Sequence, residues 1–370
     1  MDEATEHETR LAIRMVYRVV FFAFVLYFAT SLVVHEDARL AWYGRSAVQT
    51  DELVARGGRR MYTTTHHAWH LDRDAVWGDR PVVWITGSSI TREAFDADLL
   101  RRDLAARGLD WGVEKVAFDR GAPLFSWAML DGMDIRPGDR VLTSVHYDNF
   151  RADWLDYIGG FHVYLNHILR PRHLFQVQSL PWADRLEYSL ASAPPATFHR
   201  AREPFPDGLE GWLQYTLGRT PRRDGPPTIE PPKPFTMREQ VENFRELDRT
   251  SKLPLGPEEL ALRDGQVNHD ALHAFMDEVR ALGAEPWVLF LPPSPEYYER
   301  FERGLFSTDF HRYMRAEFHP YVRMSPQPQR NYTDYKHVNL HGRPILTRQL
   351  VQLLATTPLG ESPVPPPKGD

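Results

Sequence analysis

Short apolar runs alternate with amphipathic stretches in the first half of the chain. Residues 81–86 are a short apolar run that predicts a strand, and residues 113–118 and 139–145 predict a second and a third strand. Residues 92–107 place their apolar side chains at helical spacing. Residues 121–130 predict a turn that leads into a further helix. Strands and helices therefore alternate along this part of the sequence.

The alternation resumes near the C-terminus. Residues 268–282 predict a helix, residues 286–291 a fourth strand and residues 344–354 a closing helix. Between the two parts, prolines crowd residues 171–262, which we expect to form an insertion of short helices and loops. Strand–helix repeats of this kind build right-handed βαβ units. The sequence therefore predicts an α/β domain with three layers, in which helices cover both faces of a mostly parallel sheet.

A separate apolar stretch lies near the N-terminus. Residues 19–34 carry no charge, and extension back to residue 13 makes the stretch long enough, at about 1.5 Å per residue, for a hydrocarbon core of about 30 Å. Arginines precede the stretch and acidic residues follow it, which favours a cytoplasmic N-terminus. We therefore expect residues 13–34 to be a transmembrane signal anchor in the lipid bilayer. The protein would be a single-pass protein of an inner or plasma membrane, with its domain outside the cytoplasm.

Two other readings of this stretch have less support. A cleaved signal peptide would need a small-residue cleavage site after the run, whereas Ala29-Thr30-Ser31 lies inside it. A buried helix of the domain would be unusual with apolar residues on every side so close to the terminus. The predicted organisation is a cytoplasmic segment, the anchor, a juxtamembrane region, the α/β domain with its insertion, and a disordered tail (residues 1–12, 13–34, 35–80, 81–355 and 356–370).

Composition narrows the function. The 370 residues carry a formal net charge of −6 without a block of lysines or arginines, so we exclude nucleic acid as a partner. The absence of cysteine excludes disulfides, cysteine-ligated zinc and a thiol nucleophile. His66, His67 and His70 lie close together, but surface or packed histidines explain them better than a metal site does. We expect neither a metal nor a cofactor.

The turn after the first predicted strand carries the candidate nucleophile. Gly87-Ser88-Ser89 places Ser89 just beyond the carboxyl end of the strand, where parallel sheets bind their ligands. The helix that follows offers free N–H groups to a developing oxyanion, and a serine so placed can attack a carbonyl when a base is near. A serine that only caps a helix would have the same sequence. The assignment therefore needs a base.

Asp334 and His337 are the candidate acid and base. Their spacing allows the carboxylate to hold the imidazole Nδ1–H, which leaves Nε2 free to take a proton from a serine. The same spacing recurs at Asp270 and His273, inside an amphipathic helix, where we expect a solvated face. The pair at 334 and 337 differs because it follows all the predicted strands and directly precedes the closing helix.

The two motifs together resemble those of SGNH (GDSL-type) hydrolases. Gly87-Ser88-Ser89-Ile90 is similar to the first block of that family, whose nucleophile is the serine in third place. Asp334-x-x-His337-Val338-Asn339-x-x-Gly342-x4-Thr347 is similar to the last block, which supplies the acid and the base. The resemblance spans roughly residues 80–355 apart from the insertion. It implies an SGNH, flavodoxin-like fold with Ser89, His337 and Asp334 as the catalytic triad.

The resemblance also implies an oxyanion hole. In the family the second block contributes a glycine N–H after the second strand, and Gly121 fits this position. The third block contributes an asparagine side chain after the third strand. Asn149 is our choice here and Asp148 the other alignment, although the glycine that usually precedes this asparagine is missing. The Ser89 N–H, Gly121 and Asn149 would together form the hole.

The Gly-Ser-Ser variant of the first block, together with an anchor, is similar to D-alanyl transfer proteins of teichoic acid and to accessory proteins of exopolysaccharide O-acetylation. The resemblance implies an esterase or O-acyltransferase that acts on an acylated polysaccharide or another cell-envelope substrate, beside a membrane-bound O-acyltransferase. The irregular third block and the long insertion favour a rival function, a catalytically inactive scaffold that binds a partner in such a complex. A plain secreted-type esterase is the third alternative.

Overall fold

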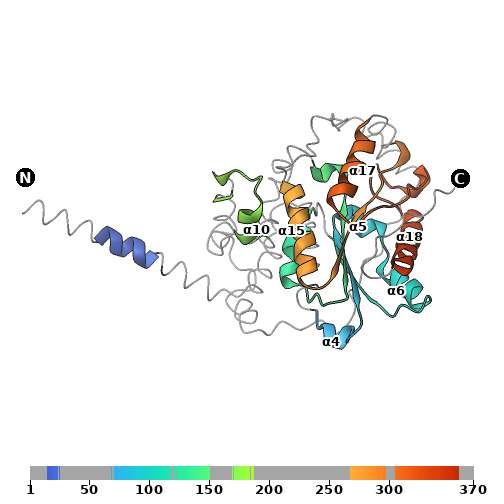
Figure 1. The fold of residues 1–370 in the computed structure, drawn as a ribbon, viewed down its shortest axis with the longest axis horizontal. Helices are drawn as coiled ribbons and strands as arrows, with labels where there is room; N and C mark the ends of the chain where they lie inside the picture. Colours follow the sequence, from blue (N-terminus) through green and yellow to red (C-terminus); the bar gives the residue numbers. More distant parts are fainter. Residues whose placement is uncertain are drawn as a thin grey trace, which may run out of the picture.

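The computed structural model of the protein describes a large part of the predicted domain and short pieces outside it (Figure 1). The predicted tail from residue 358 onward and most of the predicted insertion and juxtamembrane region lie outside the described residues. The structure describes residues 15–23, 25, 68, 71–117, 121, 123–150, 169, 171–183, 185–186, 267–296 and 305–357.

A parallel sheet of five strands forms the centre of the domain, in the order β2-β1-β3-β4-β5. This is the doubly wound order of flavodoxin-like folds, in which the connections reverse direction between β1 and β3. The carboxyl ends of β1 and β3 therefore lie at the edge of the sheet where such folds bind ligands. The strands are β1 (Val82–Gly87), β2 (Gly112–Ala117), β3 (Arg140–Val145), β4 (Glu285–Phe290) and β5 (Tyr321–Arg323).

Helices cover both faces of the sheet, as the alternation predicts (Figure 1). One core lies under α4 (Arg73–Val76), α7 (Pro123–Met129), α10 (Pro171–Gln176), α15 (Val267–Ala281) and α17 (Leu305–Glu317). The other lies under α5 (Ser89–Ala94), α6 (Ala97–Ala105) and α18 (Gly342–Thr356).

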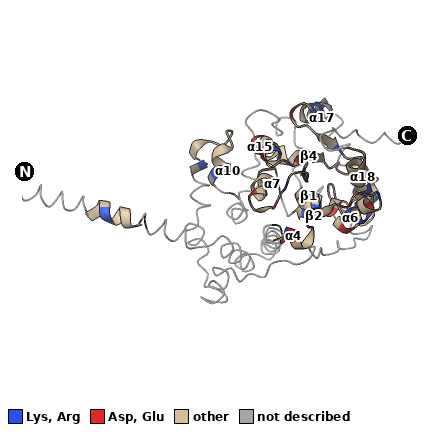
Figure 2. Ribbon diagram, turned by 60° about the horizontal axis from the view of Figure 1, so that its bottom comes forward, with Lys and Arg blue, Asp and Glu red and all other residues tan. Residues whose placement is uncertain are grey.

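Burial on both faces explains why the central strands are continuous apolar runs. Val82 and Trp84 of β1 pack in the first core, whereas Val83 and Ile85 pack in the second. Charged residues of both signs lie along the outer helix α6 (Figure 2). The four predicted strands and the α/β class are therefore confirmed.

Two features differ from the sequence prediction. The predicted helix over residues 92–107 is two helices, α5 and α6. The backbone is extended at Phe95, which ends α5, and the Asp96 carboxylate caps the start of α6 by accepting a hydrogen bond of 2.9 Å from the Leu99 N–H. β5 and α17 are additional elements that the pattern did not predict. β5 has three residues, too few to show a period.

The predicted anchor is described only in part. Residues 15–23 and 25 are helical, and large apolar side chains among them, including Phe21 and Phe22, are exposed. In the part of the chain that the structure describes, no helix combines the length and the apolar character that a bilayer crossing requires.

A buried ion pair joins α4 to the start of β3. The Arg73 guanidinium donates to both Asp139 carboxylate oxygens, at 2.5 and 2.8 Å. The same carboxylate accepts hydrogen bonds from the Val82 N–H and from the Trp84 indole, at 2.8 and 3.1 Å. Both charged side chains are almost fully buried. The pair therefore fixes the amino ends of β1 and β3 beside each other, opposite the edge that carries Ser89.

Asp139→Ala is expected to lower the free energy of unfolding by about 3–5 kcal/mol, because it leaves the buried Arg73 charge without its partner. Urea denaturation of the detergent-solubilised protein would measure the change. The matched control is Asp110→Ala, which breaks the exposed ion pair with Arg80 and is expected to change stability by less than about 1 kcal/mol. Equal effects of the two substitutions would contradict this account of the Arg73–Asp139 pair.

Candidate active site

The serine turn is formed where β1 ends and α5 begins. Ser88 is extended, and its hydroxyl accepts a hydrogen bond of 3.2 Å from the Ile90 N–H. Gly87 has φ +145°, and a Cβ at this position would overlap the hydroxyls of Thr91 and Ser144, which bond to each other. Glycine is therefore required on both conformational and steric grounds. The turn leaves Ser89, which is half-buried, at the first position of α5.

Asn339 shapes the loop that carries His337. Its side-chain nitrogen donates to the Arg330 carbonyl at 2.8 Å, and its side-chain oxygen accepts from the N–H groups of His341 and Gly342 at 2.9 and 3.3 Å. The Thr333 N–H closes the loop with a 2.7 Å hydrogen bond to the His337 carbonyl. The loop and the start of α18 are thus one hydrogen-bonded unit.

The structure brings Ser89, His337 and Asp334 together, although 248 positions separate Ser89 from His337 in the chain. Ser89 Oγ lies 2.9 Å from His337 Nε2, and His337 Nδ1 lies 2.7 Å from Asp334 Oδ2. The other Asp334 oxygen accepts hydrogen bonds from the N–H groups of Lys336 and His337, both at 2.8 Å. These distances allow a proton to pass from the hydroxyl to the imidazole while the carboxylate holds the ring.

Asp334 is held in its ionised form. Burial alone would raise the pKa of this carboxyl, but the His337 ring and the N–H groups of Lys336 and His337 hold the pKa below its ordinary value. The carboxylate is therefore charged at neutral pH and can stabilise an imidazolium at His337.

Contacts between α18 and the α5–α6 pair hold the two halves of the site together. Arg343 donates to the Glu93 carbonyl at 2.9 Å and forms an ion pair with the Glu93 carboxylate. The Thr347 hydroxyl accepts a 3.0 Å hydrogen bond from the Asp96 N–H, in the break between α5 and α6. Gly342 lies against Asn331, so that a Cβ at 342 would overlap the Asn331 carbonyl. The last motif thus packs the His337 loop onto the helix that starts at Ser89.

Gly121 lies directly against the serine turn. A Cβ on Gly121 would overlap the Gly87 carbonyl oxygen and come within 3.1 Å of the Ser88 nitrogen. Gly121 therefore lies beside the turn that carries Ser89.

Asn149 is oriented by its own turn. Its side-chain oxygen accepts a 2.8 Å hydrogen bond from the His146 N–H, in the turn η2 (Tyr147–Phe150) that follows β3. The side-chain amide is left as the donor, and no hydrogen bond among the described residues joins it to Ser89, His337 or Gly121. The side chain of Asp148, the other alignment, lies outside the described residues. The oxyanion assignments remain predictions.

Two titratable side chains near the triad, His146 and Lys336, were not assigned from the sequence. Burial, together with the nearby Lys336 and His337, lowers the pKa of His146 well below its ordinary value. Burial also lowers the pKa of Lys336 to about 8. His146 directly follows β3, and this position at a strand end was the only sequence signal for its proximity to the site.

The prediction that Asp270 and His273 lie on a solvated helix face is wrong in part, because both side chains contact other segments of the domain. The Asp270 carboxylate accepts a 2.8 Å hydrogen bond from the Ser179 N–H, and His273 Nε2 lies 3.8 Å from a carboxylate oxygen of Glu317. Burial and the neighbouring His269 lower the pKa of His273 below its ordinary value. The three histidines weighed as a metal site (His66, His67 and His70) lie outside the described residues.

No protein-family model matches the chain, and no curated protein is significantly similar to it in sequence. The class of protein is therefore described from its fold and from the geometry of its candidate site. The protein contains an α/β domain with a five-stranded parallel sheet and a contiguous Ser–His–Asp arrangement at the turn after β1.

Gly87→Ala is expected to lower the free energy of unfolding by about 1–3 kcal/mol more than Gly108→Ala. Both glycines have positive φ, but a Cβ at Gly108 meets open space, whereas a Cβ at Gly87 meets Thr91 and Ser144. Parallel urea denaturation of the two variants would measure the difference between them. A Gly87→Ala variant as stable as Gly108→Ala would show that the turn can relax without cost.

Proposed function

We propose that the protein is a serine esterase or O-acyltransferase of the SGNH kind, in which Ser89 is the nucleophile, His337 the base and Asp334 its orienting acid. The observation that carries the proposal is the unbroken chain of contacts from Ser89 Oγ to His337 Nε2, at 2.9 Å, and from His337 Nδ1 to Asp334, at 2.7 Å. The motif order and the flavodoxin-like strand order support the family resemblance.

Acyl transfer would proceed in two steps. In the first, His337 Nε2 takes the proton of Ser89 Oγ as the oxygen attacks an ester carbonyl carbon, and the imidazolium then protonates the departing alcohol. In the second, His337 deprotonates water or a sugar hydroxyl, which attacks the acyl-serine. The imidazolium then returns the proton to Ser89 Oγ as an acid or a new ester is released. Hydrolysis and transfer differ only in the second nucleophile.

The transition states of both steps place negative charge on the carbonyl oxygen, which requires hydrogen-bond donors. We assign this role to the Ser89 N–H, the Gly121 N–H and the Asn149 amide. The packing of Gly121 against the serine turn supports its part in this set. The role of Asn149 is supported by the hydrogen bond that its side-chain oxygen accepts from the His146 N–H. This bond leaves the amide N–H groups of Asn149 as the available donors.

The proposed setting is the outer face of an inner or plasma membrane. The exposed apolar side chains of the helix at residues 15–23 support anchoring by residues 13–34. The proposed substrate is an acylated polysaccharide or another cell-envelope ester, and the proposed partner is a membrane-bound O-acyltransferase. A catalytically inactive scaffold is the competing function, and it predicts the opposite result in the labelling experiment.

Ser89→Ala is expected to abolish labelling of the detergent-solubilised protein by a fluorophosphonate probe, which reacts with activated serines. The matched control is Ser88→Ala. That serine is adjacent, and among the described residues its hydroxyl accepts one hydrogen bond, from the Ile90 N–H, so labelling should persist with a stability loss of about 1 kcal/mol. Gel fluorescence of the three proteins would measure the result. Absence of labelling in the wild type would support the scaffold and overturn the enzymatic proposal.

Asp334→Asn is expected to lower the rate of hydrolysis of a small acyl ester by up to about ten-thousandfold, because an asparagine can hold the wrong imidazole tautomer, as in other serine triads. Steady-state kinetics with p-nitrophenyl acetate would measure kcat. Asp98→Asn, at an exposed position of α6 paired with Arg101, is the control and should leave kcat unchanged. Unchanged turnover in Asp334→Asn would argue against its role in the triad.

A further inference from the structure

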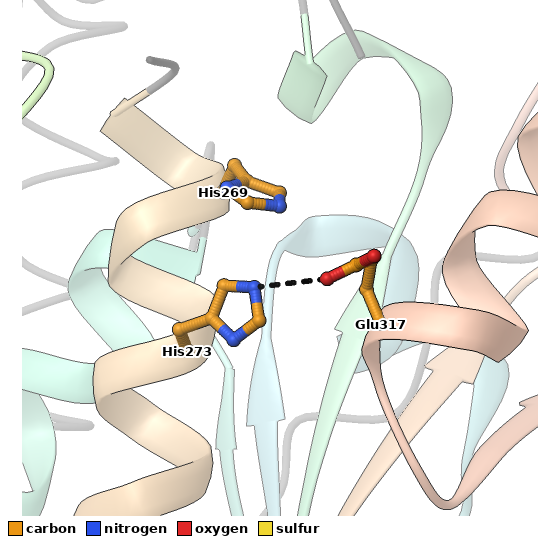
Figure 3. Close-up of side chains that lie close together, drawn as sticks. All are labelled: His269, His273 and Glu317. Atoms are coloured by element: carbon orange, nitrogen blue, oxygen red, sulfur yellow. Dashed lines mark ion pairs between the residues drawn. The ribbon is translucent and has the colours of Figure 1, made fainter. Parts of the chain in front are cut away.

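Two histidines of α15 face a glutamate at the end of α17 (Figure 3). His269 and His273 are one helical turn apart and project from the same side of α15. Glu317, the last residue of α17, reaches toward them, and its carboxylate lies 3.8 Å from His273 Nε2. One potential ligand atom from each of the three side chains lies within 4.8 Å of the others. The three form the α15–α17 cluster.

We propose that the α15–α17 cluster is a zinc site that joins the two helices. Two imidazoles and one carboxylate form a donor set typical of zinc with three protein ligands and a fourth position left for water or another group. Bonds of about 2.0–2.2 Å in a tetrahedral site place ligand atoms about 3.3 Å apart, so small side-chain rotations would close the cluster around the ion. Calcium and magnesium prefer oxygen ligands, and this set offers two nitrogens.

His269 Nδ1 is buried and has no hydrogen-bond partner among the described residues. Its Nδ1 lies 3.7 Å from the Asp270 carboxylate, and Asp270 is itself held by the Ser179 N–H at 2.8 Å. Histidine ligands commonly direct their second ring nitrogen at such a carboxylate. The other nitrogen, Nε2, is therefore the proposed ligand atom. It contacts the Tyr313 hydroxyl, which would move aside or fill the fourth position when zinc binds.

The α15–α17 cluster lies apart from the triad, with His269 buried and Glu317 exposed. His269 is 5% exposed, and the Phe318 ring packs against both imidazoles, at centroid distances of 5.5 and 4.6 Å. The cluster belongs to the face of the sheet under α15 and α17, whereas Ser89 starts α5 on the opposite face. We therefore assign zinc to a site that joins α15 to α17 and does not depend on the proposed acyl-transfer function.

The test is zinc binding by the full-length, detergent-solubilised chain after removal of metals with EDTA. Competition with a chromophoric chelator should show one tightly bound zinc in the wild type, and His273→Ala and Glu317→Gln should each bind at least about tenfold more weakly. His341→Ala, which removes an exposed histidine elsewhere, is the control and should bind zinc like the wild type. Equal affinity of the wild type and Glu317→Gln, or no zinc bound by the wild type, would overturn the proposal.

Thermal unfolding provides a second measurement. Zinc at a hundredfold excess over Kd should raise the Tm of the wild type by about 5 °C or more, and magnesium should not. His273→Ala should lose this shift. If His273→Ala fails to fold, Glu317→Gln decides the question, because Glu317 is exposed and its replacement should leave the metal-free Tm unchanged. A zinc-dependent Tm shift of the same size in Glu317→Gln would contradict the site.

Discussion

The attachment of α18 to the α5–α6 pair is the constraint on which the candidate site depends. Ser89 and His337 are far apart in the chain, and this packing brings the start of α5 beside the loop that precedes α18. The Arg343–Glu93 ion pair holds the first turn of α18 at α5, and Thr347 holds the second at the break after Phe95. Because Asn339 joins the loop to the same end of α18, the position of the imidazole follows from the position of the helix.

The far end of α18 is fixed just as firmly, which prevents the helix from pivoting about its first turn. Arg140, buried at the start of β3, donates to the carbonyls of Leu354 and Thr357 at 3.0 and 2.5 Å. Its guanidinium also pairs with Glu285 of β4 at 2.7 Å and lies over the Trp111 and Trp287 rings, each at 4.9 Å. Arg140 thus ties the last turn of α18 to two strands. A helix held at both ends gives His337 a defined distance to Ser89.

Local sequence predicted the parts of this arrangement that depend on local chemistry. Strands buried on both faces are continuous apolar runs, so β1 and β3 were recognisable, and Gly87 and Asn339 are residue types that their turns require. Contacts between distant segments left no such signal. The Thr347 hydroxyl that accepts from the Asp96 N–H at the α5–α6 break comes from about 250 residues away, and Glu317 approaches the α15 histidines because α15 and α17 share one face of the sheet. β5 was too short to recognise.

Burial also controls the charge around the imidazole. His146 lies close enough to interact electrostatically with His337, and a second imidazolium there would oppose protonation of the base. Because burial lowers the pKa of His146 well below its ordinary value, this side chain stays neutral at pH 7 and the opposition is removed. Lys336 keeps most of its charge at pH 7 and loses it as the pH rises through about 8. The ionised Asp334 carboxylate, 2.7 Å from His337 Nδ1, is therefore the direct counter-charge for a proton taken from Ser89.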